Sequence, residues 1–154
     1  MDVDFARMIF SGNYYAWVER AFETWQLDLG LSWRELIVQH HLGLATIETR
    51  CHYLAPIGLM EELEVELSVR DLDERGFTSD FQVTRVDDAR LSAFGYFRRR
   101  FLDLETHAPR RNAPEHALAV FRRMVEASQL PSYDERTAAH RLAREAEEVD
   151  GARR

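Results

Sequence analysis

Two carboxylates stand at the start of the chain, where the sequence reads MDVDFARMIFSGNYYAWVERAFETW. Asp2 and Asp4 come shortly before Ser-Gly-Asn and an aromatic segment with helical spacing. A carboxylate can attack a carbonyl carbon or act as a general base. The plainer interpretation is a solvated terminus without a chemical role. The two aspartates are therefore candidate catalytic residues that need a structural context.

Other side chains give weaker evidence for a catalytic or binding site. His40-His41 and Cys51-His52 fit no compact metal-ligand spacing, so no metal site is expected. All basic residues are arginines, which excludes Schiff-base and P-loop lysine chemistry, and no GxSxG, P-loop or GxGxxG motif occurs. The run Arg98-Arg99-Arg100 could bind phosphates, form a solvated strand face or contact another subunit.

The element beside the aspartates is a predicted helix over residues 13–29. Its apolar residues recur at i, i+3, i+4 spacing, with Ser11 as a candidate N-cap and Gly30 as a candidate stop. The apolar stripe comprises Tyr14, Trp17, Val18, Ala21, Phe22, Trp25 and Leu29, which we expect to lie in the core; Tyr15 lies off it. A short helix over 32–39 follows, because Ser32 and Glu35 form a capping-box pattern.

From residue 43 to 104 the period changes to two, which predicts strands. Short turns between the strands predict antiparallel pairing, with one polar face toward water. The expected inward-facing sets are Ala45, Ile47, Thr49, Cys51 and Tyr53, then Leu63, Val65, Leu67 and Val69, then Phe77, Ser79, Phe81 and Val83; the last strand spans 90–104.

Pro114 opens a third helix, 114–127, and the chain then becomes highly charged. We expect one domain over 1–127 and a charged helix or tail over 128–154. The order of helix, antiparallel sheet and helix predicts an α+β fold in which the sheet wraps around the long helix.

Composition narrows the function classes. The 154 residues carry a net charge of −7, which disfavours nucleic acid as a partner. No apolar run is long enough to span a membrane, and the acidic N-terminus does not resemble a signal peptide. A single cysteine predicts no disulfides and fits a cytoplasmic protein.

In this order the motifs resemble the 4-hydroxybenzoyl-CoA thioesterase family of the hotdog fold. The likeness covers residues 2–116: an opening DVDFARMIFSGNYYAWVERAFE, then LGLSWREL, then CHYLAPIGLMEELEVELSV, then RFLDLETHAPRRNAPE. Each motif is weak alone, and the ordered set is fairly specific.

The resemblance implies an acyl-CoA thioesterase that needs no cofactor. It places the catalytic carboxylate at Asp4, as nucleophile or general base, and the oxyanion-binding backbone N–H at Ser11. It assigns substrate contacts to Gly12, Asn13 and Tyr15, and a CoA phosphate contact to Arg75, with Arg98 or Arg100 second. An aryl acyl group is weakly favoured by the aromatic side chains near this site, Phe10, Tyr14 and Tyr15.

In this fold, subunits pair edge to edge, so a homodimer or homotetramer is expected. The alternative function is a non-catalytic module that binds acyl-CoA or an acyl-carrier protein, because only three residues precede Asp4 where the fold normally has a strand. A hotdog hydratase is a weaker alternative, since no convincing Asp-His pair is present.

Overall fold

The computed structural model describes residues 10–151, with side chains described to residue 145. One long helix is followed by a short π-helical segment, four strands and two further helices. The elements are α1 (Gly12–Asp28), η1 (Glu35–Gln39), β1 (Leu42–Tyr53), β2 (Leu63–Asp73), β3 (Gly76–Arg85), β4 (Leu91–Asp103), α2 (Glu115–Ala127) and α3 (Tyr133–Gly151).

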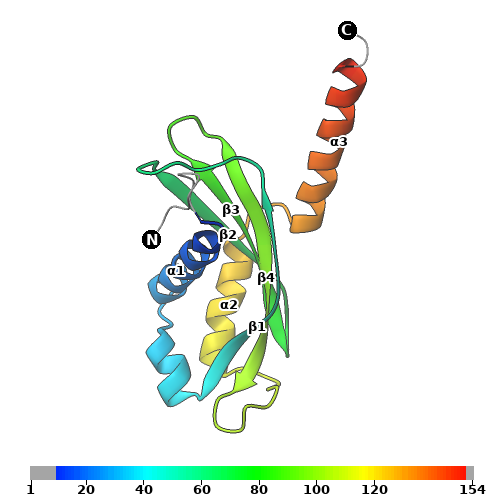
Figure 1. Ribbon diagram of the computed structural model, residues 1–154. Coiled ribbons are helices and arrows are strands. Elements are labelled where there is room, and N and C mark those ends of the chain that lie inside the picture. Colours follow the sequence, from blue (N-terminus) through cyan, green and yellow to red (C-terminus); the bar gives the residue numbers. More distant parts are fainter. Residues whose placement is uncertain (1–9, 152–154) are drawn as a thin grey trace.

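The four strands form one antiparallel sheet in the order β1-β4-β3-β2. Helices α1 and α2 both pack on its inner face, and α3 leaves from the opposite side (Figure 1). The predicted α+β arrangement, an antiparallel sheet curved around a long helix, is confirmed. The prediction missed that α2 shares this face with α1.

Two apolar clusters fill the space between the sheet and these helices. Near the start of α1, Tyr14 and Val18 pack on Phe81 and Val83 of β3. Further along, Phe22 stacks on Phe77 at 5.8 Å, and Phe77 meets Phe121 of α2 at 4.8 Å between ring centroids. The predicted inward faces of β2 and β3 are therefore correct.

The predicted inward face of β1 is correct only after a β-bulge. The register with β4 shifts between Thr46 and Glu48, so Ile47 is an extra residue that is 56% exposed. Thr49, Cys51 and Tyr53 lie opposite inward-facing residues of β4, as predicted. Ala45, opposite Arg100, lies on the other face. Strict alternation placed Ala45 and Ile47 inside, and the bulge makes both placements wrong.

The predicted boundaries of α1 and α2 hold to within one residue, whereas the short helix predicted over 32–39 is the π-helical segment η1, which begins at Glu35. Helix α1 ends one residue early, and Gly30 adopts φ +91°, the left-handed conformation that glycine provides at little cost. Ser32 Oγ accepts the Glu35 N–H at 3.1 Å, as the capping-box pattern predicted. Pro114 is the N-cap of α2 rather than its first helical residue.

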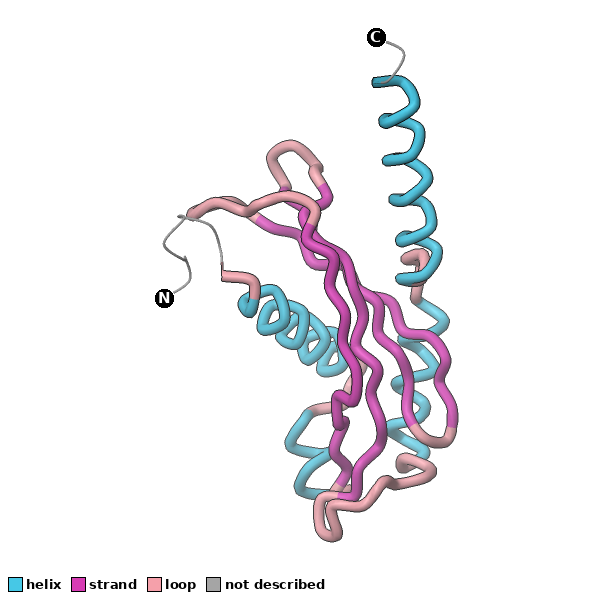
Figure 2. Tube along the Cα trace, turned by 45° about the vertical axis from the view of Figure 1, so that its right-hand side comes forward, coloured by secondary structure: helices cyan, strands magenta, loops and turns pink. Residues whose placement is uncertain are grey.

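After α2 the chain crosses the outer edge of β2 and reaches the other face of the sheet. Ser128 Oγ accepts the backbone N–H of Val69, and Ser68 Oγ accepts that of Leu130 at 2.8 Å. Tyr133 then packs with Phe94 and Tyr96 on the outer face, and α3 continues away from the body (Figure 2). The outer face is therefore only partly open to water. None of the described helices is both long and apolar enough to cross a membrane.

Candidate functional site

The start of α1 is held against the end of β1. The Tyr53 hydroxyl donates to the carbonyl oxygen of Ser11 at 3.3 Å, and Asn13 N–H donates to the carbonyl of Phe10 at 2.9 Å. Ser11 occupies the N-cap position without a capping hydrogen bond from its side chain. The predicted N-cap role is therefore fulfilled by position alone, and Ser11 contributes its backbone.

Aromatic rings surround this helix start. Tyr14 meets the edge of Tyr53 at 5.1 Å, and Tyr15 meets Phe97 of β4 edge-on at 5.5 Å. Burial, with Cys51 and Tyr15 close by, raises the pKa of Tyr53, so its hydroxyl stays a proton donor at neutral pH. The start of α1 and the end of β1 therefore form an aromatic corner against which a planar group can pack.

Cys51 lies in the same corner but is not an activated nucleophile. Burial raises the pKa of its thiol to about 11, which leaves it protonated at neutral pH. Reactive cysteines have lowered pKa values and electropositive surroundings. In the described part of the chain, no group of three or more His, Cys, Asp or Glu side chains could hold a metal ion.

The structure brings some predicted site residues together and separates others. Ser11, Gly12, Asn13 and Tyr15 share the first turn of α1. Asp4 lies outside the described residues, so its catalytic role stays a prediction.

Arg75 lies at the other end of the sheet. Tyr53 pairs with Ala93 of β4, whereas Gly76, next to Arg75, pairs with Arg100. Seven residues of strand separate these positions, roughly 23 Å at the usual rise per residue. The Arg75 side chain is exposed and lies 3.7 Å from Glu74. Within one chain, Arg75 therefore cannot reach a thioester held at Ser11.

The three consecutive arginines of β4 have different surroundings. Arg98 pairs with Glu48 at 3.0 Å, and Arg100 lies 3.7 Å from Asp73. Arg99 points the other way, into the space beneath α1, where both oxygens of Glu19 accept from its Nη2 at 3.1 Å. Sequence reasoning missed this pair, although strand alternation alone puts Arg99 on the face opposite its neighbours.

Two cavities of the structure lie away from the helix start. One, of about 550 Å³, is lined by the β2–β3 turn and α2. Another, of about 420 Å³, runs along the exposed side of α1 between Trp17 and Trp25. Neither is lined by Ser11.

Comparisons with known proteins agree with the expected family. Residues 1–134 match the family model of the thioesterase-like superfamily. No curated protein matches the chain.

Solved structures share the fold at low sequence identity. The 4-hydroxybenzoyl CoA thioesterase from Pseudomonas sp. strain CBS-3 is 18% identical, with a TM-score of 0.70, covering 77% of this chain and 90% of that one. A 1,4-dihydroxy-2-naphthoyl-CoA thioesterase from Synechocystis is also 18% identical, with a TM-score of 0.71 and coverages of 78% and 87%. A Staphylococcus aureus protein in complex with CoA is 17% identical, with a TM-score of 0.75 and coverages of 86% and 82%.

Proposed function

The chain belongs to the thioesterase-like superfamily, and we propose that it hydrolyses the thioester of an acyl-CoA to a free acid and CoA. Membership of this family agrees with the predicted enzyme class, a thioester hydrolase. The observation that carries the proposal is the start of α1, where Ser11 is tied to β1 by Tyr53 and flanked by aromatic rings.

In the proposed reaction, the backbone N–H of Ser11 binds the thioester oxygen. The first N–H groups of a helix lack intrahelical acceptors, and the helix dipole favours negative charge there. Attack on the carbonyl carbon moves charge onto this oxygen. One well-placed donor lowers the barrier by about 3 kcal/mol.

Asp4 is the proposed carboxylate. As a general base it removes a proton from water, whose oxygen bonds to the carbonyl carbon; the carbon–sulfur bond then breaks, and the proton passes from Asp4 to the departing CoA thiolate. As a nucleophile it forms a mixed anhydride and releases CoA thiolate, which takes up a proton; water then cleaves the anhydride. Both routes consume one water and release one acid and one thiol.

For the acyl group we propose an aryl acid. The rings of Tyr14, Tyr15, Tyr53 and Phe97 lie around the start of α1. Aromatic rings favour edge-on and offset contacts with a planar ring, which a flexible alkyl chain does not reproduce. Related solved structures include thioesterases for hydroxylated aryl-CoA substrates, which supports the same class here.

For CoA we propose that Arg75 contacts a phosphate and that the thioester lies at the start of α1. Because roughly 23 Å separates these places within one chain, either the extended CoA bridges them or Arg75 serves the site of a second subunit. Arg98 and Arg100 are weaker candidates, since each faces a carboxylate already.

The site is proposed to form in a homodimer or homotetramer. The outer edge of β2 is occupied near Val69 by Ser128, whereas β1 is the other edge strand of the sheet. Edge strands tend to pair with another strand. Pairing through β1 would bring a second chain next to Tyr53 and the start of α1.

The decisive experiment compares Asp4→Asn with Asp2→Asn in hydrolysis of benzoyl-CoA. Both variants lose one carboxylate from the same segment, so any effect of net charge is matched. We expect Asp4→Asn to lose at least a hundredfold in kcat/KM and Asp2→Asn to stay near wild type. Equal activity of the two variants would contradict the role of Asp4. A wild type that binds acyl-CoA without releasing thiol would favour the binding-module alternative.

A further inference from the structure

A notch lies in the exposed flank of α1, and the proposed reaction does not use it. Trp17, Ala21 and Trp25 follow one another at i, i+4 spacing, so a methyl group stands between two indole rings. The cavity there, of about 420 Å³, is lined by six residues of α1: Trp17, Arg20, Ala21, Thr24, Trp25 and Asp28. A hollow of this size with aromatic walls can take a planar group.

The two tryptophan rings are held in place by the core. Trp17 packs on the apolar cluster that contains Val18 and Phe81, and Trp25 packs on the cluster that contains Phe22. Both side chains are half-buried, so part of each ring contacts the core and part lines the notch. Rings that are fixed before a ligand arrives lose little entropy on binding. The notch is thus a preformed stacking surface for a flat ring.

The notch carries one charge of each sign, at different points along the helix. Arg20 lies beside Ala21, and Asp28 lies roughly 12 Å further along the helix axis. Both side chains are exposed, and neither forms an ion pair or a hydrogen bond with another described residue. An anionic group therefore fits near Arg20, and a hydrogen-bond donor fits near Asp28.

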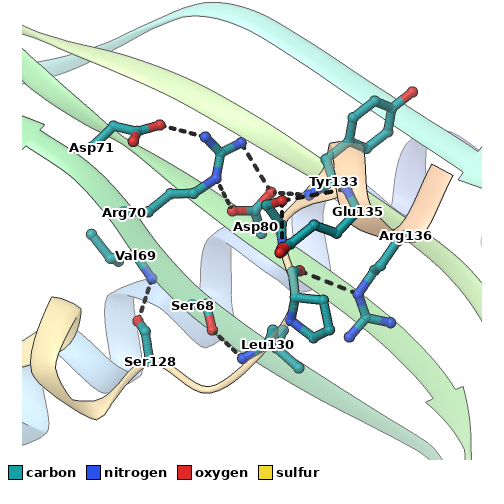
Figure 3. A network of polar contacts seen from close by, with 12 residues as sticks. Ser68, Val69, Arg70, Asp71, Asp80, Ser128, Leu130, Tyr133, Glu135 and Arg136 are labelled. Atoms are coloured by element: carbon teal, nitrogen blue, oxygen red, sulfur yellow. Dashed lines mark hydrogen bonds and ion pairs between the residues drawn. The ribbon is translucent and has the colours of Figure 1, made fainter. Parts of the chain in front are cut away.

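Other arginines beside the sheet are already engaged. Arg70 Nε donates to Oδ2 of the buried Asp80 at 2.6 Å on the outer face (Figure 3). On the inner face, Arg99 donates to Glu19 at 3.1 Å. Arg20 differs from both, because its guanidinium is exposed and lies in the same notch as two indole rings. It is therefore available to an anion that also carries a flat ring.

The order of these groups along α1 matches the order of the parts of CoA. The proposed oxyanion donor, the Ser11 N–H, lies at the start of the helix, Arg20 follows roughly 14 Å along the axis, and Asp28 ends the helix. In an acyl-CoA, the thioester is followed by the pantetheine arm, the diphosphate and then the adenosine. Adenine is planar and has an exocyclic amino group, which can donate to a carboxylate.

We propose that the notch binds the nucleotide half of CoA, with adenine stacked on Trp25, its amino group toward Asp28, and a phosphate on Arg20. This inference rests on the proposed acyl-CoA substrate and adds the place of its nucleotide. Arg20 is on the same helix as Ser11, whereas Arg75 is roughly 23 Å from the helix start. CoA carries phosphate both in the diphosphate and on the ribose, so Arg75 remains a candidate for the other phosphate in the site of a second subunit.

Calorimetry with adenosine 3′,5′-bisphosphate, a fragment of CoA without the pantetheine arm, tests the notch directly. We expect the wild type to bind this probe and Arg20→Ala to raise its dissociation constant about tenfold, because a charge-assisted contact is lost. Ala21→Phe fills the notch and should also raise the dissociation constant. Arg34→Ala is the matched control: it removes an exposed arginine outside α1 and should leave the dissociation constant unchanged.

A kinetic comparison separates this inference from the proposed reaction. The ratio of kcat/KM for benzoyl-CoA to that for S-benzoyl-pantetheine measures what the nucleotide contributes. We expect Arg20→Ala to lower this ratio about tenfold, through the benzoyl-CoA value alone. The inference is overturned if the wild type does not bind the bisphosphate, or if Arg20→Ala binds it like the wild type. A wild type that binds the bisphosphate through Arg20 but releases no thiol from benzoyl-CoA would support the notch and reject the proposed hydrolysis.

Discussion

Arg99 extends from the inner face of the sheet, and its Nη2 donates to both carboxylate oxygens of Glu19 at 3.1 Å. The arginine side chain is 2% exposed and that of Glu19 is 34% exposed. The guanidinium also lies 4.5 Å from the Phe22 ring centroid and 5.0 Å from that of Phe97. Since Phe97 contacts Tyr15, this pair fixes the rotation of α1 beneath the proposed site.

The difference in burial predicts unequal costs for removing each partner. Glu19→Ala leaves a buried, charged guanidinium and should cost about 3 kcal/mol in the free energy of unfolding. Arg99→Met should cost less, because the Glu19 carboxylate can turn to water and methionine fills the space. The double variant should be more stable than Glu19→Ala alone. Urea unfolding measures all three, and an Arg99→Met cost equal to that of Glu19→Ala would contradict this prediction.

The fold was predictable where one periodicity continues without interruption. The faces of β2 and β3 follow from strict alternation, and the limits of α1 follow from its stripe and Gly30. The bulge at Ile47 was not predictable, because it depends on how β1 pairs with β4 rather than on local composition. Helix α2 was predicted as an element, but its place beside α1 depends on long-range packing.

Of the candidate site, only the continuous stretch from Ser11 to Tyr15 was predictable from the sequence. Ser11 to Tyr15 lie together because they are neighbours in sequence, whereas Tyr53 reaches Ser11 across 42 positions of chain. Arg75 seemed suitable as a phosphate contact by its residue type, but the register of β3 on β4 places it at the far end of the sheet. Distances of this kind come from strand pairing, which residue types alone do not specify.

Cys51 predicts a measurable pH dependence of stability. Its thiol pKa is raised from 9.0 to about 11 by burial, so the unfolded chain loses this proton at lower pH than the folded chain. Between pH 9 and 11 the unfolded state binds fewer protons, and stability must fall as pH rises. The fall in urea midpoint from pH 8.5 to 10.5 should be larger for wild type than for Cys51→Ala. Equal falls would show that the thiol is not buried as described.

The edge strand β1 predicts the effect of a charge on oligomerisation. Ile47 is exposed at the bulge of β1, and Val86, 49% exposed, lies after β3 in a turn away from this edge. A lysine on an edge strand opposes pairing with another strand. Ile47→Lys should therefore lower the mass measured by light scattering at micromolar concentration, and Val86→Lys should not. A wild-type monomer would contradict the proposed dimer.

Arg75 predicts a salt-dependent contribution to CoA affinity. Its side chain is exposed, and its ion pair with Glu74 is long, at 3.7 Å, and solvated, so the guanidinium is available to a phosphate. Arg75→Ala should raise the dissociation constant for CoA about fivefold at low salt and less at physiological salt. Arg90→Ala is the matched control in another exposed turn. Calorimetry that gives the same affinity for Arg75→Ala and wild type would remove Arg75 from the site.

Tyr53→Phe tests whether the start of α1 is positioned for catalysis. The substitution removes only the hydroxyl that donates to the Ser11 carbonyl and keeps the ring against Tyr14. One such hydrogen bond contributes about 1 kcal/mol, which corresponds to about a fivefold change in rate if it is expressed in the transition state. We expect kcat for benzoyl-CoA to fall by this factor, with KM and the urea midpoint little changed. Because the raised pKa of Tyr53 keeps the hydroxyl protonated, the loss should not vary between pH 6 and 9.

Tyr133→Phe makes the same chemical change on the outer face of the sheet and should leave kcat unaltered. If both variants lose activity equally, or if neither does, the contact between Tyr53 and Ser11 holds the fold without positioning the oxyanion donor.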